Sequence, residues 1–311
     1  MIHITQGHEE SIAIETLVKS LQMLSGKQLQ NFCYHINKDV LDTNLKKLNI
    51  RVRVKDNNLY FDSRKYIRCN FIKSSNENSS FNSILSSLSI IKKDDILITP
   101  PTSKDKFFYN GKRFAGHTDF LRNYYDKKLT MNFINDTEQM LILTDHVSID
   151  NVSNALNILD ITEQIELSID YIAKYFRRKI KYVHISGINP HSGENGLISR
   201  KDEIINESIK ILSQKNPYLK FRGPIPGDIQ SSLLTDPINT LQVYCHHDQG
   251  LSYFKFKNGF IGLNTTFGLD YLRLSVDHGT ANKLYGLNQA NPLGSYFVLI
   301  NALKIHENTK P

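Results

Sequence analysis

Met140-Leu141-Ile142-Leu143-Thr144-Asp145-His146 is an apolar, strand-like run that ends in a histidine. Two further histidines end or follow such runs: His191 follows residues 182–190, and His247 closes residues 241–247. Open α/β sheets gather their chemistry at the carboxyl ends of the strands. Three imidazoles delivered there could hold one divalent metal and leave a coordination position open for substrate. One such histidine is more simply a polar residue at a strand end, but three together favour a metal site formed by His146, His191 and His247.

Strand-like and helix-like segments alternate along the chain, and this alternation predicts an α/β fold. The clearest segments are strands at residues 2–4 and 95–99, helices at residues 12–24, 83–91 and 292–304, and a polar loop at residues 74–80. Residues 151–178 are expected to form two helices broken near Asp160, with Thr162 as an N-cap. Ser199 is expected to cap a further helix that runs to about Gln214.

The composition is that of a globular protein. The 311 residues suffice for one large or two ordinary domains. No apolar run is long enough to span a bilayer, and the N-terminus lacks the basic start and apolar stretch of a signal peptide. The three cysteines show no paired spacing, which suits a reducing compartment. We therefore expect a cytoplasmic protein without a membrane segment.

The chain is basic, with a formal net charge of +7 and a pI near 9.1. Its basic residues are nevertheless spread widely. The densest cluster, residues 177–181, falls at the expected end of a helix, where cations complement the helix dipole. We therefore do not expect nucleic-acid binding. A diffuse positive charge suits an enzyme that attracts phosphorylated or carboxylated metabolites.

Residues 111–118, Gly-Lys-Arg-Phe-Ala-Gly-His-Thr, nearly match a phosphate-binding P-loop, but His117 stands where the lysine should be. No GxGxxG motif occurs in the chain. The segment could still present hydrogen-bond donors to an anion. The alternative is a helix start capped by Thr118 or Asp119.

Residues 187–196 hold three glycines, a proline and His191 before a predicted helix, a composition typical of a functional loop. Further on, Lys255, Asn264 and Arg273 are spaced nine residues apart on strand-like segments. Lysine and arginine together suit phosphate or carboxylate recognition, although three solvated side chains explain the spacing about equally well. The turn at residues 277–281 could clamp a nucleotide or could simply be a turn.

Six motifs, in this order and spacing, resemble the 4-hydroxythreonine-4-phosphate dehydrogenase family of vitamin B6 synthesis. They lie in roughly the last two thirds of the chain and are Gly116-His117-Thr118-Asp119, Thr144-Asp145-His146, Gly187-Ile188-Asn189-Pro190-His191-Ser192-Gly193-Glu194, Gly223-Pro224-Ile225-Pro226-Gly227-Asp228, His247-Asp248-Gln249-Gly250-Leu251 and Ser275-Val276-Asp277-His278-Gly279-Thr280-Ala281. The front of the chain departs from the family, which opens with a turn ending in Gly-Ile-Gly-Pro-Glu. Here that turn is residues 7–15, Gly-His-Glu-Glu-Ser-Ile-Ala-Ile-Glu.

The resemblance implies an isocitrate/isopropylmalate-dehydrogenase-like fold, with two α/β domains and an active-site cleft between them. We expect residues 1–110 and 285–311 to form the cofactor-side domain, and residues 111–284 to form the central domain. The resemblance also implies a homodimer in which the active site is shared between subunits. His247 would reach in from the partner to complete the metal site.

The resemblance further assigns roles to individual residues. The metal, which could be zinc, cobalt or magnesium, would be held by His146, His191 and His247. The positions that match the family's substrate-binding residues are His117, Thr118, Lys255, Asn264 and Arg273. The cofactor would be NAD, bound at the turn formed by Asp277, His278, Gly279 and Thr280. Asp228 is a candidate for moving a proton or orienting a metal ligand.

The implied reaction is NAD- and metal-dependent oxidation, with decarboxylation, of 4-phosphooxy-L-threonine to 3-amino-2-oxopropyl phosphate in pyridoxal 5'-phosphate biosynthesis. A related dehydrogenase acting on 4-phosphoerythronate or 4-phosphothreonate is one alternative. A metal-dependent phosphatase or hydrolase that uses the three histidines is another, and a binding protein without catalytic activity is a third.

Overall fold

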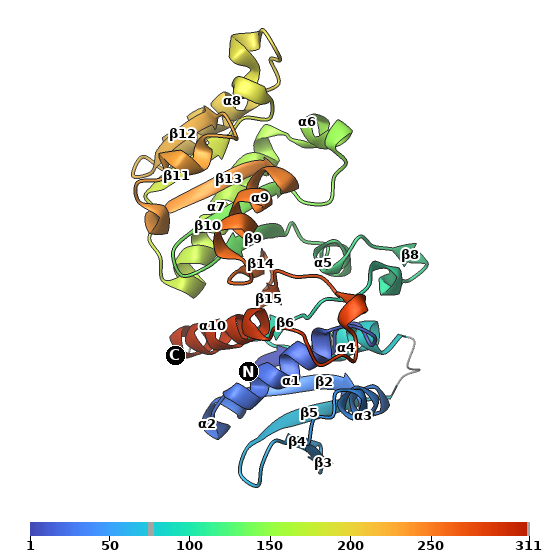
Figure 1. The fold of residues 1–311 in the computed structure, drawn as a ribbon. Helices are drawn as coiled ribbons and strands as arrows, with labels where there is room; N and C mark the ends of the chain where they lie inside the picture. Colours follow the sequence, from blue (N-terminus) through green and yellow to red (C-terminus); the bar gives the residue numbers. More distant parts are fainter. Residues whose placement is uncertain (74–77, 310–311) are drawn as a thin grey trace. The chain divides into compact units, whose positions relative to one another are not determined.

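The computed structural model describes residues 1–73 and 78–309, and the chain forms two compact units. Unit 1 comprises Met1–Lys127, Phe260–Leu263 and Leu269–Pro311, and unit 2 comprises Lys128–Gly259 and Asn264–Gly268. Each unit has mainly parallel strands covered by helices (Figure 1), so the predicted α/β class is confirmed. The division differs from the expected one, because residues 111–127, 260–263 and 269–284 belong to unit 1.

Unit 1 is built on a sheet whose buried centre is parallel. In spatial order its strands are β15 (Leu272–Val276), β6 (Ile96–Ile98), β1 (Ile2–Ile4), β2 (Phe32–Asn37), β5 (Tyr66–Ile72), β4 (Asn58–Tyr60) and β3 (Arg53–Lys55). Strands β1, β2 and β6 are buried along their whole length, which explains why their sequences read as short apolar runs. The last two strands pair antiparallel at the edge.

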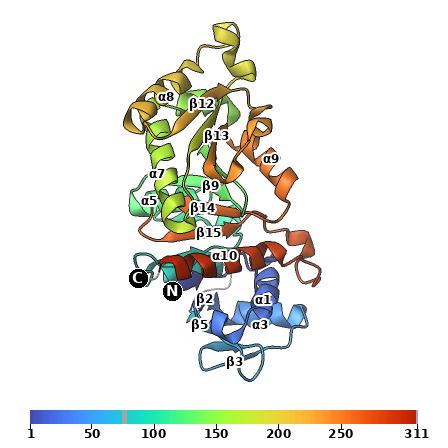
Figure 2. The same ribbon diagram turned by 90° about the vertical axis from the view of Figure 1, so that its left-hand side faces the viewer.

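Helices cover this sheet. They are α1 (Ala13–Met23), α2 (Gly26–Leu29), α3 (Lys38–Lys47), α4 (Ser79–Leu88), α5 (His117–Tyr125) and α10 (Leu293–Thr309). Helix α1 packs against α10, which lies across β15, β6 and β1 (Figure 2), and α4 lies over β2 and β5. A small hairpin is formed by β7 (Phe108–Tyr109) and β8 (Lys112–Arg113).

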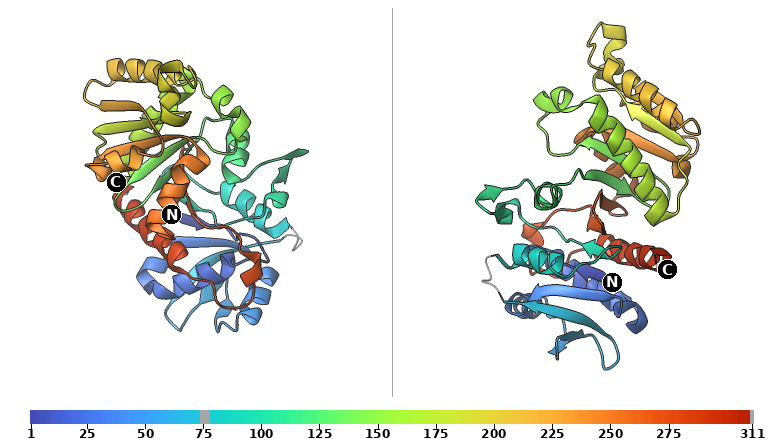
Figure 3. Two further views of the ribbon diagram at one scale, coloured as in Figure 1. Left: turned by 45° about the horizontal axis from the view of Figure 1, so that its top comes forward. Right: turned by 180° about the vertical axis from the view of Figure 1, so that it is seen from behind.

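Unit 2 has a second mainly parallel arrangement. Its strands are, in spatial order, β12 (Lys220–Ile225), β11 (Tyr182–Ser186), β13 (Thr240–His246), β10 (Gln139–Thr144), β9 (Thr130–Ile134) and β14 (Leu263–Phe267). Its helices are α6 (Val152–Ala155), α7 (Ile158–Phe176), α8 (Glu203–Lys215) and α9 (His247–Asn258). Figure 1 shows α9 on one face of these strands, and the view from behind in Figure 3 shows α7 on the other face.

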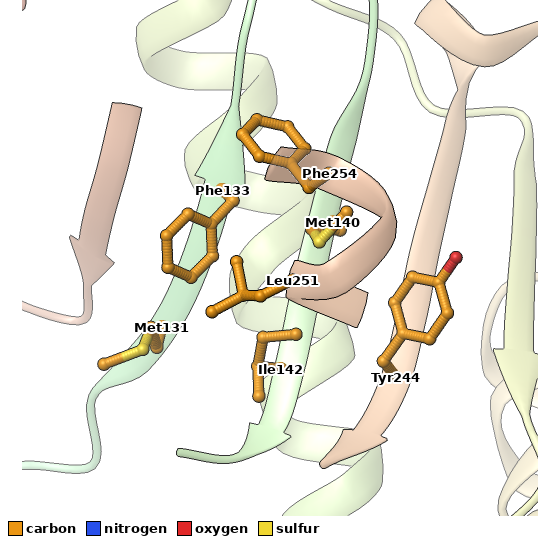
Figure 4. Packing of buried hydrophobic residues seen from close by; sticks show 7 residues of the cluster. All are labelled: Met131, Phe133, Met140, Ile142, Tyr244, Leu251 and Phe254. Atoms are coloured by element: carbon orange, nitrogen blue, oxygen red, sulfur yellow. The ribbon is translucent and has the colours of Figure 1, made fainter. Parts of the chain in front are cut away.

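The core between α9 and the sheet is apolar (Figure 4). It consists of Met131, Phe133, Met140, Ile142, Tyr244, Leu251 and Phe254. Gly250 lets the helix approach this closely, since a Cβ there would lie 2.7 Å from Tyr244 Cδ2 and 2.9 Å from Ile142 Cδ1. Because alternate residues of a strand face opposite sides, the buried Leu141 faces away from α9.

Several predicted elements are confirmed, and some boundaries are wrong. The strands at residues 2–4 and 95–99 and the helices at 12–24 and 292–304 are present as β1, β6, α1 and α10. Within residues 151–178 the break lies before Asn157, whose side chain accepts the Asp160 N–H at 2.9 Å and caps α7. Thr162 lies inside α7, so it is not an N-cap.

The predicted cap at Ser199 is also wrong, because α8 begins at Glu203. The Ser199 hydroxyl instead accepts the Lys201 N–H in the preceding turn. Residues 74–77 of the expected loop lie outside the described residues, and Ser79 and Ser80 already belong to α4. Within residues 1–73 and 78–309, no helix combines the length and the apolar character needed to cross a membrane.

The turn at residues 7–15, which differs from the family's usual sequence, contacts the start of helix α4 through Glu9. Oε1 of the buried Glu9 accepts hydrogen bonds from Ser80 N (2.8 Å) and Ser79 Oγ (2.9 Å) at the start of α4. Its Oε2 lies 3.0 Å from His8 Nδ1. Burial by itself would raise the pKa of Glu9, but the hydrogen bonds from His8, Ser80 and Ser79 outweigh it and lower the pKa to about 2. The charged form is therefore the one that stabilises the fold.

We predict that Glu9→Gln lowers the free energy of unfolding at neutral pH. The pKa of Glu9 is about 2 in the folded chain against a usual 4.5, and at ~1.4 kcal/mol per pKa unit this difference corresponds to about 3 kcal/mol. Because the folded-state pKa is the lower one, this stabilisation is present above pH 4.5 and is lost as the pH falls from 4.5 toward 2. Denaturant unfolding at a series of pH values measures it.

The matched control is Glu10→Gln, which removes the neighbouring exposed carboxylate. It should leave both the stability and its acid dependence nearly unchanged. If Glu9→Gln and Glu10→Gln unfold alike at every pH, Glu9 does not anchor α4.

Candidate functional site

The three predicted metal ligands all lie at strand ends in unit 2. His146 follows β10, His247 opens α9 directly after β13, and His191 lies in the loop after β11. Strand β13 pairs parallel with both β10 and β11, so all three strands end at the same edge of the sheet. The predicted placement after strands is thus confirmed, whereas the binding of a metal stays a prediction.

Two of the three histidines are neighbours within one chain. The ring centroids of His146 and His247 are 6.5 Å apart, and the ring planes are inclined by 33°. The side chain of His191 is 72% exposed, so the imidazole projects from its loop into open space. In one chain, therefore, His146 and His247 come together.

Each of the three histidines also has a carboxylate facing its Nδ1 atom. The pairs are His247 with Asp248 (2.6 Å), His191 with Glu194 (3.8 Å) and His146 with Asp145 (3.9 Å). A carboxylate at Nδ1 orients an imidazole and leaves Nε2 to bind a metal. The donor set therefore fits a divalent ion that accepts nitrogen ligands.

The loop that carries His191 has an unusual backbone. Its residues His191, Ser192, Glu194 and Asn195 have φ angles of 51°, 51°, 47° and 52°. Gly193 between them has a φ of 81°. This left-handed backbone conformation costs energy for residues other than glycine, so contacts with the surrounding residues must hold the loop in place.

Asp202, just before α8, supplies these contacts, and the sequence analysis did not identify it. Its buried carboxylate accepts hydrogen bonds from Ile188 N (2.6 Å), Asn189 N (3.4 Å) and Asn189 Nδ2 (2.6 Å). Gly187 makes room for it, since a Cβ there would lie 2.7 Å from Asp202 Oδ1. An acidic residue between a glycine-rich loop and a helix was the one signal in the sequence.

Two cavities border the loop, and His191 lines both. The larger has a volume of about 540 Å³ and a polar lining that includes Arg200 and Asp202. The smaller, of about 420 Å³, is lined by Asp228, His246 and Gln249 among others. The structure thus brings the predicted Asp228 to the same cavity as His191. His246 is a second residue that the sequence analysis missed.

In unit 1, His117 and Thr118 open α5, so the alternative of a helix start is confirmed, but the predicted caps are wrong, because Gly116 is the N-cap and no side chain of the described residues caps the helix. The Asp119 carboxylate accepts the Ala115 N–H at 2.9 Å. Thr118 is buried. The His117 ring meets the Phe107 ring edge-on, with centroids 4.7 Å apart.

Arg273 lies buried in β15 of the same unit. Its Nε and Nη2 atoms donate to Thr99 Oγ1 at 2.9 and 2.7 Å. Burial lowers the pKa of Arg273 to about 10, which leaves the guanidinium charged at neutral pH. Burial, and then the charge of Arg273, lower the pKa of His117, which therefore stays neutral. A fixed cation beside a neutral imidazole is an arrangement that can receive an anion.

The remaining predicted substrate residues lie in different settings. Lys255 is exposed on helix α9, so the prediction that it lies on a strand is wrong. Asn264 lies on β14 as predicted. The spacing of nine residues therefore does not reflect a repeated strand position.

Two of the predicted substrate positions hold polar atoms without a protein partner. His117 Nε2 and Asn264 Oδ1 are both buried and form no hydrogen bond within the part of the chain that the structure describes. Buried polar atoms in folded proteins are usually satisfied, so an atom of this kind requires an explanation. Within each unit, a bound polar ligand is one explanation for such an atom.

The predicted cofactor turn lies against the start of α1. Ile12 N, at the N-cap of α1, donates to Thr280 O at 3.1 Å. His278 Nδ1 lies 3.0 Å from Gly279 O within the turn. A turn beside a helix N-terminus lies in the electrostatic environment that favours a phosphate group.

Comparison with known proteins gives consistent matches. Residues 27–304 match the family model of the pyridoxal phosphate biosynthetic protein PdxA. A 4-hydroxythreonine-4-phosphate dehydrogenase of Hydrogenobaculum is 35% identical over 193 residues, or 62% of this chain and 59% of that protein. One of Vibrio parahaemolyticus is 31% identical over 221 residues, or 68% of this chain and 64% of that protein. The chain thus spans about three fifths of the length of these curated relatives.

Solved structures share the fold. A 4-hydroxythreonine-4-phosphate dehydrogenase from Klebsiella pneumoniae superimposes with a TM-score of 0.77 at 21% identity, covering 98% of this chain and 99% of that chain. One from Burkholderia phymatum gives 0.73 at 23% identity, covering 98% and 97%. The chain therefore has the same α/β fold as these 4-hydroxythreonine-4-phosphate dehydrogenase structures.

We predict that Asp202→Asn loosens the loop that carries His191. The change removes a charged acceptor from the Ile188 and Asn189 amides. A charge-assisted hydrogen bond contributes about 1.5–3 kcal/mol, so these amides should exchange with solvent on the order of ten- to a hundredfold faster. Hydrogen–deuterium exchange resolved by residue measures this.

Glu203→Gln, one position along the chain, is the matched control, because this carboxylate is exposed. It should leave exchange in the loop unchanged. Equal exchange rates in Asp202→Asn and the unmodified protein would show that other contacts hold the loop.

Proposed function

We propose, from the premise that the chain belongs to the PdxA family, that it is an NAD- and divalent-metal-dependent dehydrogenase. Its substrate would be 4-phosphooxy-L-threonine, oxidised and decarboxylated to 3-amino-2-oxopropyl phosphate. Similar proteins from Hydrogenobaculum and Vibrio parahaemolyticus bear the name 4-hydroxythreonine-4-phosphate dehydrogenase. The observation that carries the proposal is that each unit holds a buried atom without a hydrogen-bond partner among the described residues at a position expected to bind substrate, His117 Nε2 in unit 1 and Asn264 Oδ1 in unit 2.

The metal would be bound by the Nε2 atoms of His146, His191 and His247. The Asp248 carboxylate, 2.6 Å from His247 Nδ1, would keep that imidazole in the tautomer that presents Nε2, whereas Asp145 and Glu194 lie 3.9 and 3.8 Å from their histidines and add only negative charge nearby. When bound, a divalent ion such as zinc or cobalt, both of which accept imidazole ligands, would polarise the substrate oxygens and favour loss of the hydroxyl proton, while NAD would accept the hydride.

Arg273 and His117 would bind the substrate's anionic and polar groups. The guanidinium of Arg273 is positioned by two hydrogen bonds to the Thr99 hydroxyl. The neutral His117 can exchange a hydrogen bond through Nε2 without adding charge. Thr118, Lys255 and Asn264 are proposed as further substrate contacts.

Asp228 would act beside the metal ligands. It lines the same cavity as His191 and is exposed there, so it can accept a proton from substrate or water or orient the His191 loop. NAD would bind at the turn of Asp277, His278, Gly279 and Thr280, where the start of α1 adds the positive end of a helix dipole.

A substrate panel tests the proposal. The protein, NAD and a divalent metal are mixed with 4-phosphooxy-L-threonine, 4-phosphoerythronate or 4-phosphothreonate, and both NADH and free phosphate are measured. NADH should form with the highest kcat/KM for 4-phosphooxy-L-threonine, and a chelator should abolish it. Phosphate release without NADH would replace the dehydrogenase with a phosphatase, and a preference for another acid would change the substrate.

The variant Arg273→Lys tests whether Arg273 binds the substrate. Lysine keeps the positive charge but lacks the planar guanidinium that hydrogen-bonds to Thr99. A charge-assisted contact of about 1.5–3 kcal/mol corresponds to a loss of roughly ten- to a hundredfold in kcat/KM. The loss should be much smaller for an analogue that lacks the contacted anionic group. Equal losses for both would make Arg273 structural.

The active site is further proposed to be shared between the subunits of a homodimer. The resemblance implies that the partner subunit supplies His247. In this structure, however, His146 and His247 are neighbours within one chain. The alternative is therefore that the partner subunit supplies His191. Mixing inactive His→Ala subunits in pairs distinguishes the two. If His247 completes the site of the other subunit, a mixture of His146→Ala and His247→Ala subunits regains activity. If His191 does so, a mixture of His146→Ala and His191→Ala subunits regains activity instead.

Recovery should reach about a quarter of normal activity, since half of the dimers would be hybrids with one of two sites intact. Subunit exchange is verified with differently tagged chains. Activity in none of the three mixtures, after exchange is verified, would mean that each chain supplies its own complete site.

A further inference from the structure

A second cluster of metal-binding side chains lies in unit 1, which does not contain the strand-end histidines of unit 2. It consists of His3 on β1 and Cys33 and His35 on β2. His3 and Cys33 are direct partners in the parallel pairing of the two strands, and His35 is two residues further along β2. Because alternate residues of a strand face the same side, Cys33 and His35 face one side of the sheet together.

The donor atoms of this cluster are close to one another. His3 Nδ1 and His35 Nε2 are 3.0 Å apart. One donor atom from each of the three side chains lies within 4.8 Å of the others. In a tetrahedral zinc site with Zn–N near 2.0–2.1 Å and Zn–S near 2.3 Å, ligand atoms are roughly 3.3–3.6 Å apart. A small side-chain movement therefore suffices to enclose an ion.

The outer ring nitrogens are held in the way that metal-binding histidines usually are. His3 Nε2 faces Asp95 Oδ2 at 3.4 Å, and His35 Nδ1 faces both Ser86 Oγ at 3.3 Å and Asn70 Nδ2 at 3.2 Å. Asp95 is itself fixed by the N-terminal ammonium of Met1 (2.7 Å) and by Lys92 N (2.9 Å). A carboxylate or hydroxyl on the outer nitrogen orients an imidazole toward a metal on its inner side.

The cluster is enclosed by protein. His3, Cys33 and His35 are 4%, 6% and 0% exposed. The two imidazoles and the thiol therefore meet in a setting from which bulk water is excluded. A nitrogen and sulfur donor set of this kind selects zinc-like ions over magnesium or calcium, which require oxygen ligands.

We propose that His3, Cys33 and His35 form a structural zinc site that joins β1 to β2. The ligands are His3 Nδ1, His35 Nε2 and the Cys33 thiolate, and water completes the tetrahedron. Without metal, the hydrogen bond between the imidazoles requires a proton on His35 Nε2, because Asp95 holds the His3 proton on Nε2. With metal, that proton moves to His35 Nδ1 and is donated to Ser86, and the Asn70 amide, whose Nδ2 lies 3.2 Å from His35 Nδ1, must turn to present its oxygen. Binding then releases one proton, from the Cys33 thiol.

Cobalt provides the test, because a thiolate bound to Co²⁺ gives a charge-transfer absorption that imidazole ligands alone do not. The protein is produced in cells grown with cobalt in place of zinc, so that the buried site fills during folding. The His191→Ala background removes the site proposed in unit 2, which has no thiolate. We expect one cobalt per chain and the charge-transfer band in this background, and neither in His191→Ala with Cys33→Ser.

Cys69→Ser is the matched control. Cys69 is a buried cysteine on the neighbouring strand β5, but its cross-strand partner is Tyr34, so it faces the other side of the sheet. The band should persist in this variant. Absence of cobalt and of the band in the His191→Ala background, or a band retained after Cys33→Ser, would overturn the site and leave a hydrogen-bonded pair of histidines.

A second measurement covers the case in which Cys33→Ser does not fold. X-ray absorption at the zinc edge of the His191→Ala protein, purified from zinc-supplemented cells, should show one sulfur and two imidazoles around the ion. A shell of nitrogen and oxygen only, or no bound zinc, would also overturn the proposal. Loss of dehydrogenase activity in the same background has no bearing on it, so the two proposals fail independently.

Discussion

Parallel pairing of β11, β13 and β10 is the constraint on which the candidate site in unit 2 depends. Backbone hydrogen bonds between parallel neighbours align the strands, so the residues that follow them emerge at one edge of the sheet. This alignment brings His146 and His247 to within 6.5 Å of each other, measured between ring centroids, although they are about a hundred residues apart in the chain. The strands themselves are held by apolar packing against α7 and α9. The chemistry at the edge thus depends on the core beneath it.

Much of this arrangement could be predicted from short-range patterns. Buried parallel strands read as uninterrupted apolar runs, and β1, β6 and β10 were recognisable for that reason. Helices with a single apolar face, such as α1, show their periodicity directly. The positions of His146, His191 and His247 after strands followed from the same signal. The resemblance to a known family then added proposed roles, such as substrate binding by His117, that no local pattern reveals.

What the sequence did not reveal depends on contacts between distant residues. Glu9 caps α4 from seventy residues away, and Asp202 supports backbone amides that precede it by thirteen and fourteen residues. Neither contact has a periodic signature. Helix α9 buries only Gly250, Leu251 and Phe254, so its sequence lacks a clear helical repeat of apolar residues. For this reason the sequence wrongly predicts a strand at Lys255. The cluster of His3, Cys33 and His35 depends on which strands are neighbours, and that information is also absent from local sequence.

Gly250 links the packing of the apolar core to the position of His247 at the edge of the sheet. Helix α9 begins at His247, and its distance from the sheet is set where Gly250 meets the Tyr244 ring. The imidazole of His247 is therefore positioned by the shape of the core as well as by its own hydrogen bond to Asp248. Substitutions of Tyr244 or Ile142, which touch no proposed ligand, would tilt or lift the first turn of the helix. The geometry of the proposed metal ligands can consequently change during evolution, or be adjusted by design, through apolar residues beneath the site while every histidine is kept.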